Sequence, residues 1–165
     1  GDPLDEKTTV GPLVAKRQLE LLEAQVEDAR EKGATIVTGG ARMEGLDGAY
    51  YQPTLITNVT PDMKVITDEV FGPVLPVIKF STEEEAVKLA NDTPYGLSAF
   101  VYSDDQERAL RVAKAIEAGQ LSINGCSYFS AHAPFGGYKN SGIGRGDGKY
   151  GYHGVTQMKV VSRPL

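Results

Sequence analysis

The sequence has too few cysteines for a disulfide and no apolar run long enough to cross a membrane. Its 165 residues include a single cysteine, Cys126, which excludes an internal disulfide and a cysteine-based metal cluster. No apolar run is long enough to span a bilayer and no stretch reads as a signal peptide, so a membrane partner is not expected. A lone cysteine suits a reducing compartment, and we therefore expect a cytoplasmic protein.

Positive charge is too scarce to suggest a nucleic-acid partner. The net charge of the chain is −5, which disfavours both nucleic acid and an anionic membrane. Residues 138–165 differ, because they carry five Lys or Arg against one Asp. We interpret this basic end as a solvated or interface face. Hydrophobic residues make up 41% of the chain and charged ones 24%, the balance of a globular domain rather than a disordered one.

Hydrophobic periodicity predicts alternating helices and strands. Apolar side chains recur at steps of three and four in residues 12–32, which indicates one helix ended by Gly33. Another helix is expected to begin at Ser81 or Thr82, because a run of three glutamates follows and complements its dipole. The strand–helix–strand order of the second half predicts an α/β fold with a mostly parallel sheet and packed helices. Strands are predicted at residues 35–38, 54–57, 74–80, 98–102, 120–124 and 155–161.

The region 125–154 shows no periodicity, so we predict a long loop there. Its letters include G-x-G-x-x-G at Gly146, Gly148 and Gly151. A dinucleotide-binding turn needs a strand before these glycines and a helix after them, whereas a loop precedes and a strand-like segment follows here. Turn glycines therefore explain the letters better than a phosphate site does.

The isolated candidate nucleophile and metal ligands do not combine into a site. Cys126 has no base or cation among its neighbours N-G-C-S-Y-F, so a small packing residue is favoured over a nucleophile. His132 and His153 have no Cys or acidic partner at ligand spacing. We predict no catalytic residue and no metal site in this chain.

Four separate motifs then appear in a fixed order. They read D-E-V-F-G-P-V, N-D-T-P-Y-G-L-S-A-F-V-Y-S-D-D, I-N-G-C and A-P-F-G-G-Y-K-N-S-G-I-G-R. Together they resemble the C-terminal part of the NAD(P)-dependent aldehyde dehydrogenase superfamily, over essentially the whole chain. The resemblance implies that residues 1–154 are part of a catalytic domain. It also implies that residues 155–165 contain an oligomerisation strand, which pairs with another subunit of a homo-oligomer.

The resemblance implies a role for individual residues. Glu69 matches the acid that hydrogen-bonds the nicotinamide ribose of NAD or NADP, and Phe71 matches the aromatic beside the nicotinamide. A carboxylate suits two neighbouring hydroxyls because it is an acceptor with several lone pairs. Phe129 and Phe135 match aromatics that line the tunnel for the aldehyde substrate. Asn124 matches the asparagine that ends the strand before the tunnel loop.

The same resemblance implies what this chain does not contain. The family's catalytic cysteine, general-base glutamate, oxyanion asparagine and cofactor-binding domain all lie N-terminal to the matched region. We therefore expect the chain to be inactive alone, and its parent to oxidise an aldehyde to an acid through a cysteine thiohemiacetal and thioester. One departure is visible, since Gly146 stands where the family commonly has a glutamate, and Asp147 is the candidate replacement.

A hypothesis of a different class stays open beside the enzyme. The chain could be a non-catalytic interaction module that pairs through its last strand. The missing nucleophile motif favours this alternative for the isolated chain. The presence of Glu69 and Phe71 favours descent from an enzyme.

Overall fold

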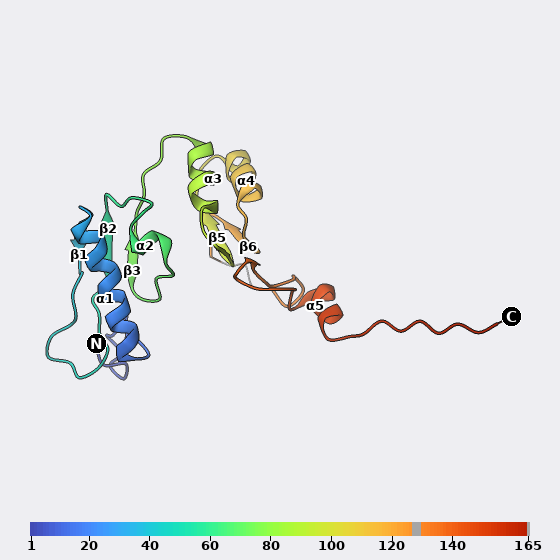
Figure 1. Cartoon of the computed structure of the whole chain (residues 1–165), viewed down its shortest axis with the longest axis horizontal. Helices are drawn as coiled ribbons and strands as arrows, with labels where there is room; N and C mark the ends of the chain where they lie inside the picture. Colours follow the sequence, from blue (N-terminus) through green and yellow to red (C-terminus); the bar gives the residue numbers. More distant parts are fainter. Residues whose placement is uncertain (127–129, 165) are drawn as a thin grey trace. The chain divides into compact units, whose positions relative to one another are not determined.

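The structure, a computed structural model, describes residues 1–126 and 130–164. The chain divides into two compact units, Gly1–Lys79 (unit 1) and Phe80–Leu165 (unit 2), and each is described by itself. Helices and strands are interspersed along both units in Figure 1, so the predicted α/β class is confirmed. Among the described helices, none combines the length and apolar character that a bilayer crossing requires.

Unit 1 is a three-stranded sheet with one long helix and one short helix. The strand order is β1-β2-β3, in which β1 and β2 are antiparallel and β2 and β3 are parallel. The pairing is therefore mixed. In chain order the elements are α1 (Lys16–Glu31), β1 (Thr35–Thr38), β2 (Thr54–Thr57), α2 (Lys64–Thr67) and β3 (Val74–Pro76).

The core of unit 1 forms where the apolar face of α1 meets β2 and α2. The predicted stripe on α1 is confirmed, and Gly33 ends the helix with a φ of +91° that suits glycine. Burial of these side chains is the main source of stability for the unit. The buried cluster consists of Leu19, Leu22, Val26, Ala29, Tyr51, Ile56, Val59, Met63 and Val65.

The edge strand β3 is shorter than predicted and contains a proline. Residues 74–80 are predicted as a strand, but only Val74–Pro76 pair with β2. Pro76 has no N–H to donate, and a position at the edge of the sheet tolerates this loss. The amide of Val77 then donates to the carbonyl of Ile56 at 2.9 Å, which ends the pairing.

The described residues of unit 2 form two small sheets and three helices. Strands β5 and β6 are parallel and joined through α4, which confirms the predicted strand–helix–strand order, while β4 and β7 are antiparallel. The elements in chain order are α3 (Glu83–Asn91), β4 (Tyr95–Gly96), β5 (Ser98–Val101), α4 (Gln106–Ala115), β6 (Gln120–Ile123), β7 (Tyr138–Lys139) and α5 (Gly148–Gly154).

The helices α3 and α4 begin at side chains that the sequence makes recognisable. The hydroxyl of Thr82 accepts a hydrogen bond from the amide of Glu85 at 3.2 Å, and the Glu85 carboxylate accepts one from the amide of Ser81. The Asp105 carboxylate accepts from the amide of Arg108 at 3.0 Å. Both caps satisfy amides that have no partner inside their helix.

The predicted strand at residues 155–161 is not formed. The described residues 155–164 are exposed and belong to no helix or sheet, and Figure 1 draws them without a strand arrow. A strand requires a partner for its main-chain groups, and no described strand of this chain pairs with the segment. Its pairing with another subunit stays a prediction.

The region predicted as a loop contains β7 and α5, so that prediction is wrong in part. The helix α5 begins at Gly148, the second glycine of the G-x-G-x-x-G letters, and the strand-like segment predicted after them is not formed. Gly151 permits this helix, because a Cβ built there would lie 2.6 Å from the carbonyl carbon of Gly146. What precedes the helix is an isolated bridge between Phe135 and Gly146 rather than a described strand, so the phosphate-binding arrangement is not formed.

Candidate functional site

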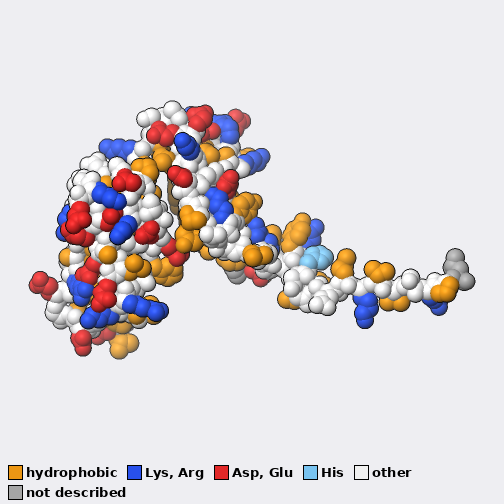
Figure 2. All heavy atoms as spheres, viewed as in Figure 1, with side chains coloured by type: hydrophobic (Ala, Val, Ile, Leu, Met, Phe, Trp, Pro, Cys, Tyr) orange, Lys and Arg blue, Asp and Glu red, His pale blue; other side chains and the backbone are white. Residues whose placement is uncertain are grey.

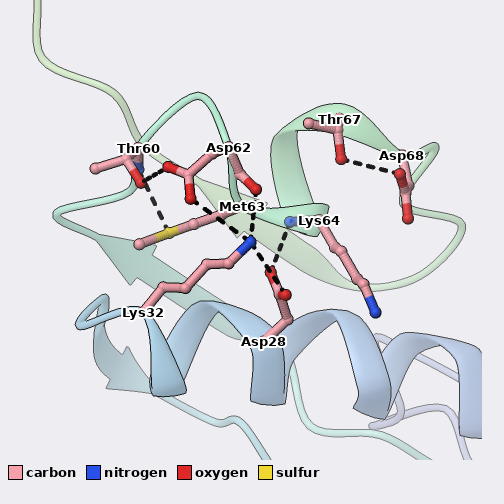
Figure 3. Close-up of polar contacts among 8 residues, drawn as sticks. All are labelled: Asp28, Lys32, Thr60, Asp62, Met63, Lys64, Thr67 and Asp68. Atoms are coloured by element: carbon pink, nitrogen blue, oxygen red, sulfur yellow. Dashed lines mark hydrogen bonds and ion pairs between the residues drawn. The ribbon is translucent and has the colours of Figure 1, made fainter.

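The segment that carries Glu69 and Phe71 leaves α2 and runs along α1 to β3. A polar network fixes its start, as Figure 3 shows. The ammonium of Lys32 donates to the carbonyl of Asp62 at 2.7 Å and lies 3.2 Å from the Asp28 carboxylate. The Asp28 carboxylate also accepts from the amide of Lys64, the first residue of α2, at 2.8 Å. The last turns of α1 therefore hold α2 by its N-terminus.

The charges in this network stabilise one another. The amide of Lys64 and the ammonium of Lys32 hold the pKa of the Asp28 carboxyl below its ordinary value. Asp28 in turn raises the pKa of Lys32. The Asp62 carboxyl accepts from the hydroxyl of Thr60, which lowers its pKa. The network is therefore fully charged at neutral pH.

Two glutamines of α1 bind the main chain of the segment directly. The carboxamide Nε2 of Gln25 donates to the carbonyl of Glu69, and that of Gln18 donates to the carbonyl of Phe71, both at 3.1 Å. Between them, Leu22 lies so close to Gly72 that a Cβ at Gly72 would be 2.6 Å from a leucine methyl carbon. Gly72 is thus required for this close approach.

These anchors determine which side chains face solvent. Val70 packs against the core of unit 1, whereas Glu69 is exposed and the Phe71 side chain is 66% exposed. Within the described part of the chain, no hydrogen bond or ion pair is formed by the Glu69 carboxylate. The segment therefore exposes a hydrogen-bond acceptor, the Glu69 carboxylate, and an apolar ring, that of Phe71, while α1 holds its main chain.

Gln25 is only half satisfied by this arrangement. Its side chain is 1% exposed, and its Oε1 finds no hydrogen-bond partner among the described residues. The sequence contains a signal for this residue, because position 25 places a polar side chain on the apolar face of α1 beside Val26. Sequence reasoning missed Gln25, and it missed Gln18 on the same helix.

Of the two predicted tunnel residues, the structure describes one. Phe129 lies outside the described residues. Phe135 is partly buried in unit 2, and its amide and carbonyl exchange hydrogen bonds of 2.9 and 2.7 Å with Gly146. The carboxamide of Gln120 donates to the carbonyl of Pro134 at 2.9 Å, which ties the segment to β6.

Lys139 holds the other end of the Phe135 segment. Its ammonium donates to the carbonyl of Asn91 at 2.7 Å and to that of Thr93 at 3.1 Å, and it lies 2.8 Å from the Glu117 carboxylate. The two carbonyls lie at the C-terminal end of α3, where a cation is favourable. The segment is therefore attached by polar contacts to main-chain groups.

Asn124 occupies the predicted position just after the end of β6. It adopts a φ of +53°, and its carboxamide accepts from the amide of Ser103 at 2.9 Å and donates to the carbonyl of Ser103 at 2.8 Å. This pair of bonds joins the turns that follow β5 and β6. Cys126, two residues further, is an exposed free cysteine.

The structure also describes Gly146, which stands where the resemblance leads us to expect a glutamate. The amide and carbonyl of Gly146 form hydrogen bonds with the main chain of Phe135. Asp147 adopts a φ of +53° at the start of α5, and its side chain does not cap that helix. Asp147 therefore lies next to Gly146, but it does not cap the helix that begins there.

Glu69 and Phe71 are thus brought together on unit 1, while Phe135 belongs to unit 2. The chain is thus an α/β protein in which an exposed acid, Glu69, and an exposed aromatic residue, Phe71, lie between the helix α2 and the edge strand β3. The model of the aldehyde dehydrogenase family matches residues 1–161. The chain belongs to the aldehyde dehydrogenase family.

Similar proteins include two enzymes from distant organisms. The mitochondrial succinate-semialdehyde dehydrogenase of Mus musculus is 47% identical over 161 residues, which cover 98% of this chain and 31% of the mouse protein. Peroxisomal aminoaldehyde dehydrogenase 1 of Pisum sativum is 47% identical over 163 residues, which cover 98% of this chain and 32% of the pea protein.

Solved structures show the same similarity. An NAD-dependent aldehyde dehydrogenase from Sinorhizobium meliloti matches all of this chain with a TM-score of 0.91 and 41% identity, over 34% of its own length. Betaine aldehyde dehydrogenase from Staphylococcus aureus, crystallised in complex with NAD+, matches 91% of this chain with a TM-score of 0.85 and 42% identity. The match covers 30% of that bacterial chain. The chain therefore spans about a third of the length of these relatives.

Proposed function

We propose that this chain is part of an NAD(P)-dependent aldehyde dehydrogenase, in which the Glu69–Phe71 segment contacts the nicotinamide end of the cofactor. The observation that carries the proposal is the exposed, unpaired carboxylate beside an exposed ring on a main chain held by α1. Betaine aldehyde dehydrogenase of Staphylococcus aureus, a similar protein, binds NAD+. The residues present fit such a group, because ribose hydroxyls need acceptors and a nicotinamide ring needs an apolar neighbour.

When bound, the cofactor would supply a hydride acceptor. The residues of this chain would supply its placement. Glu69 would accept hydrogen bonds from the ribose hydroxyls, and Phe71 would limit where the ring can lie, so that the reacting carbon stays near the substrate. Phe135, with Phe129, would line the path of the aldehyde and exclude water from a thioester.

The isolated chain is proposed to be inactive. The family's nucleophile motif is not in the sequence, and Cys126 is exposed with no activating partner among the described residues. Purified residues 1–165 should produce no NADH or NADPH from a panel of aldehydes that includes succinate semialdehyde and betaine aldehyde. Turnover that disappears in a Cys126→Ser variant would show instead that this cysteine is the nucleophile.

The test of the cofactor contact uses the full-length protein that contains this chain. Glu69→Gln should lower kcat by about ten- to a hundredfold, because a charge-assisted hydrogen bond is worth about 1.5–3 kcal/mol. The Michaelis constant for NAD+ should change less, since the adenosine half is held elsewhere. Glu31→Gln, an exposed glutamate on α1, is the matched control and should behave as wild type. Unchanged kinetics for Glu69→Gln would exclude the assigned contact.

The C-terminal segment of the chain, residues 155–164, is exposed and belongs to no helix or sheet. Figure 2 shows hydrophobic and basic side chains along the terminal segment, and residues 148–165 contain no acid. Val155, Met158, Val160 and Val161 are 83–98% exposed. An exposed segment that is rich in β-branched residues pairs readily with another chain. We infer that residues 155–165 form a contact between subunits.

This contact has a direct test in solution. The isolated chain should self-associate, and deletion of residues 155–165 should reduce the association measured by light scattering. A deletion of residues 1–9, most of which are exposed, is the control for general shortening. A monodisperse monomer of 17.7 kDa for the undeleted chain would contradict the inference.

A further inference from the structure

Gln25 combines a nearly complete burial with a single hydrogen bond. The side chain is 1% exposed, on the face of α1 that carries Leu22 and Val26. Its Nε2 donates to the carbonyl of Glu69 at 3.1 Å, and its Oε1 has no partner in the part of the chain that the structure describes. A buried polar group that is half satisfied requires a physical explanation.

Stability alone does not explain a carboxamide at this position. Burying an amide oxygen without a hydrogen bond is unfavourable, and an apolar side chain of the same volume would avoid that cost. Its neighbours Leu22 and Val26 show that the surroundings accept apolar residues. What Gln25 adds is a donor at one fixed point.

The group that receives this donor is the carbonyl of the residue proposed to contact the cofactor. Glu69 lies between α2 and β3, where its main chain belongs to no helix or strand. Among the described residues, no main-chain amide donates to the Glu69 carbonyl, so Gln25 provides its hydrogen bond. The polar network at Lys64 and the contact of Leu22 with Gly72 fix the segment on either side.

We propose that Gln25 is a positioning residue for Glu69. It holds the peptide plane that follows the Glu69 Cα, and the position of this plane constrains the direction in which the Glu69 side chain leaves the main chain. Without the donor, the segment between its two fixed points can rotate, and the carboxylate loses its direction. The inference rests on the proposed function, because Gln25 acts only through Glu69 and touches neither substrate nor cofactor.

The experiment compares four variants of the full-length protein in single-turnover formation of NADH. Gln25→Met keeps the volume and removes the donor, and it should lower the rate constant about three- to tenfold with the amplitude unchanged. In a Glu69→Gln background the same change should have less than about a twofold effect, because its target is already lost. Val26→Ala, a buried neighbour on α1, should lower thermal stability and leave the rate constant unchanged.

The outcomes separate the inference from the function on which it rests. If Glu69→Gln has no effect, both fail. If Glu69→Gln slows the reaction and Gln25→Met does not, only the positioning role is overturned. A lower amplitude with an unchanged rate constant, or equal effects in both backgrounds, would mean that Gln25 merely supports folding. If Gln25→Met does not fold, Gln25→Asn replaces it, since it keeps the carboxamide but is one methylene too short to reach the carbonyl, and the same outcomes decide.

Discussion

The two units of this chain are stabilised in different ways. In unit 1 the side chains of Leu22, Ile56 and Met63 are completely buried in one apolar cluster. In unit 2 the buried hydrophobic residues that the structure describes are three alanines, Ala109, Ala113 and Ala118. Unit 2 relies instead on polar side chains that bind main-chain carbonyls, of which Lys139 and Gln120 are the clearest.

The difference indicates where each candidate site obtains its rigidity. Glu69 and Phe71 stand on either side of Val70, which packs against the core of unit 1. The Phe135 segment is held by directional polar contacts, which include the hydrogen bond from Gln120 to Pro134 and the ion pair of Lys139 with Glu117. Exposed large apolar side chains occur in both units, for example Leu75 in unit 1 and Leu110 in unit 2, so they do not distinguish the two.

The largest expected effect tests the core of unit 1. Ile56→Ala removes a fully buried side chain from the central strand β2 and should lower the free energy of unfolding of unit 1 by about 2–5 kcal/mol. Leu110→Ala in unit 2 truncates a side chain that is 48% exposed, so it should change stability by less than about 0.5 kcal/mol. Denaturant unfolding followed by circular dichroism measures both variants. Equal losses of stability would show that unit 1 does not depend on its apolar core more than unit 2 does.

The next effect concerns a close approach of main chains in unit 2. A Cβ at Gly119 would lie 1.7 Å from the carbonyl oxygen of Gly136, so Gly119→Ala must displace the segment that follows Phe135. We expect a cost of about 1–3 kcal/mol and faster amide hydrogen exchange in residues 134–146. Gly125→Ala is the control, because among the described residues its Cβ would have no neighbour closer than 3.8 Å. Unchanged exchange in the Gly119 variant would show that the segment is not held there.

A smaller loss is expected from the cation that holds the same segment. Lys139→Met removes two hydrogen bonds to carbonyls and the ion pair with Glu117, whose side chain is 55% exposed. Because of that exposure we expect only about 1–2 kcal/mol, again measured by hydrogen exchange of residues 134–146. Lys114→Met, an exposed lysine on α4, should have no effect. An equal effect of both variants would argue for a general loss of charge.

The smallest effect depends on pH and lies in unit 1. The folded state lowers the pKa of Asp28 from its ordinary 3.8, so the stabilisation is fully present above pH 3.8 and is lost as the pH falls through the folded value. Asp28→Ala should therefore lower the unfolding midpoint at neutral pH, and the difference from wild type should shrink in acid. Glu31→Ala on the same helix is the control. A difference that stays constant with pH would exclude the charge of Asp28 as its cause.

The sequence predicted those elements whose signals are local. The side chain of Thr82 and the positive φ of Gly33 mark helix ends through contacts within a few residues, and both lie where the pattern indicates. The alternation of strands and α4 in unit 2 was likewise evident from periodicity. Local chemistry is sufficient for such features, because the residues concerned are neighbours in the chain.

Features set by distant contacts were not predictable in the same way. The short helix α2 begins where Asp28, 36 residues earlier, accepts from the amide of Lys64. The direction of the Glu69 side chain depends on Gln25, 44 residues earlier. The sequence pattern shows that a glutamine lies on the apolar stripe of the helix, but it does not indicate which group that glutamine binds. Residues 155–161 have the alternation of a strand, but periodicity does not reveal whether a partner strand exists in the same chain.

The hydrogen bonds from Gln18 and Gln25 have one more consequence, which concerns mutational freedom. Both glutamines bind carbonyl oxygens, and every amino acid has a carbonyl oxygen whatever its side chain. Substitutions at Glu69 or Phe71 therefore leave these two attachments intact, whereas a larger residue at Gly72 would collide with Leu22. The two outward positions can change their chemistry through single substitutions, while the surface that supports them stays as it is.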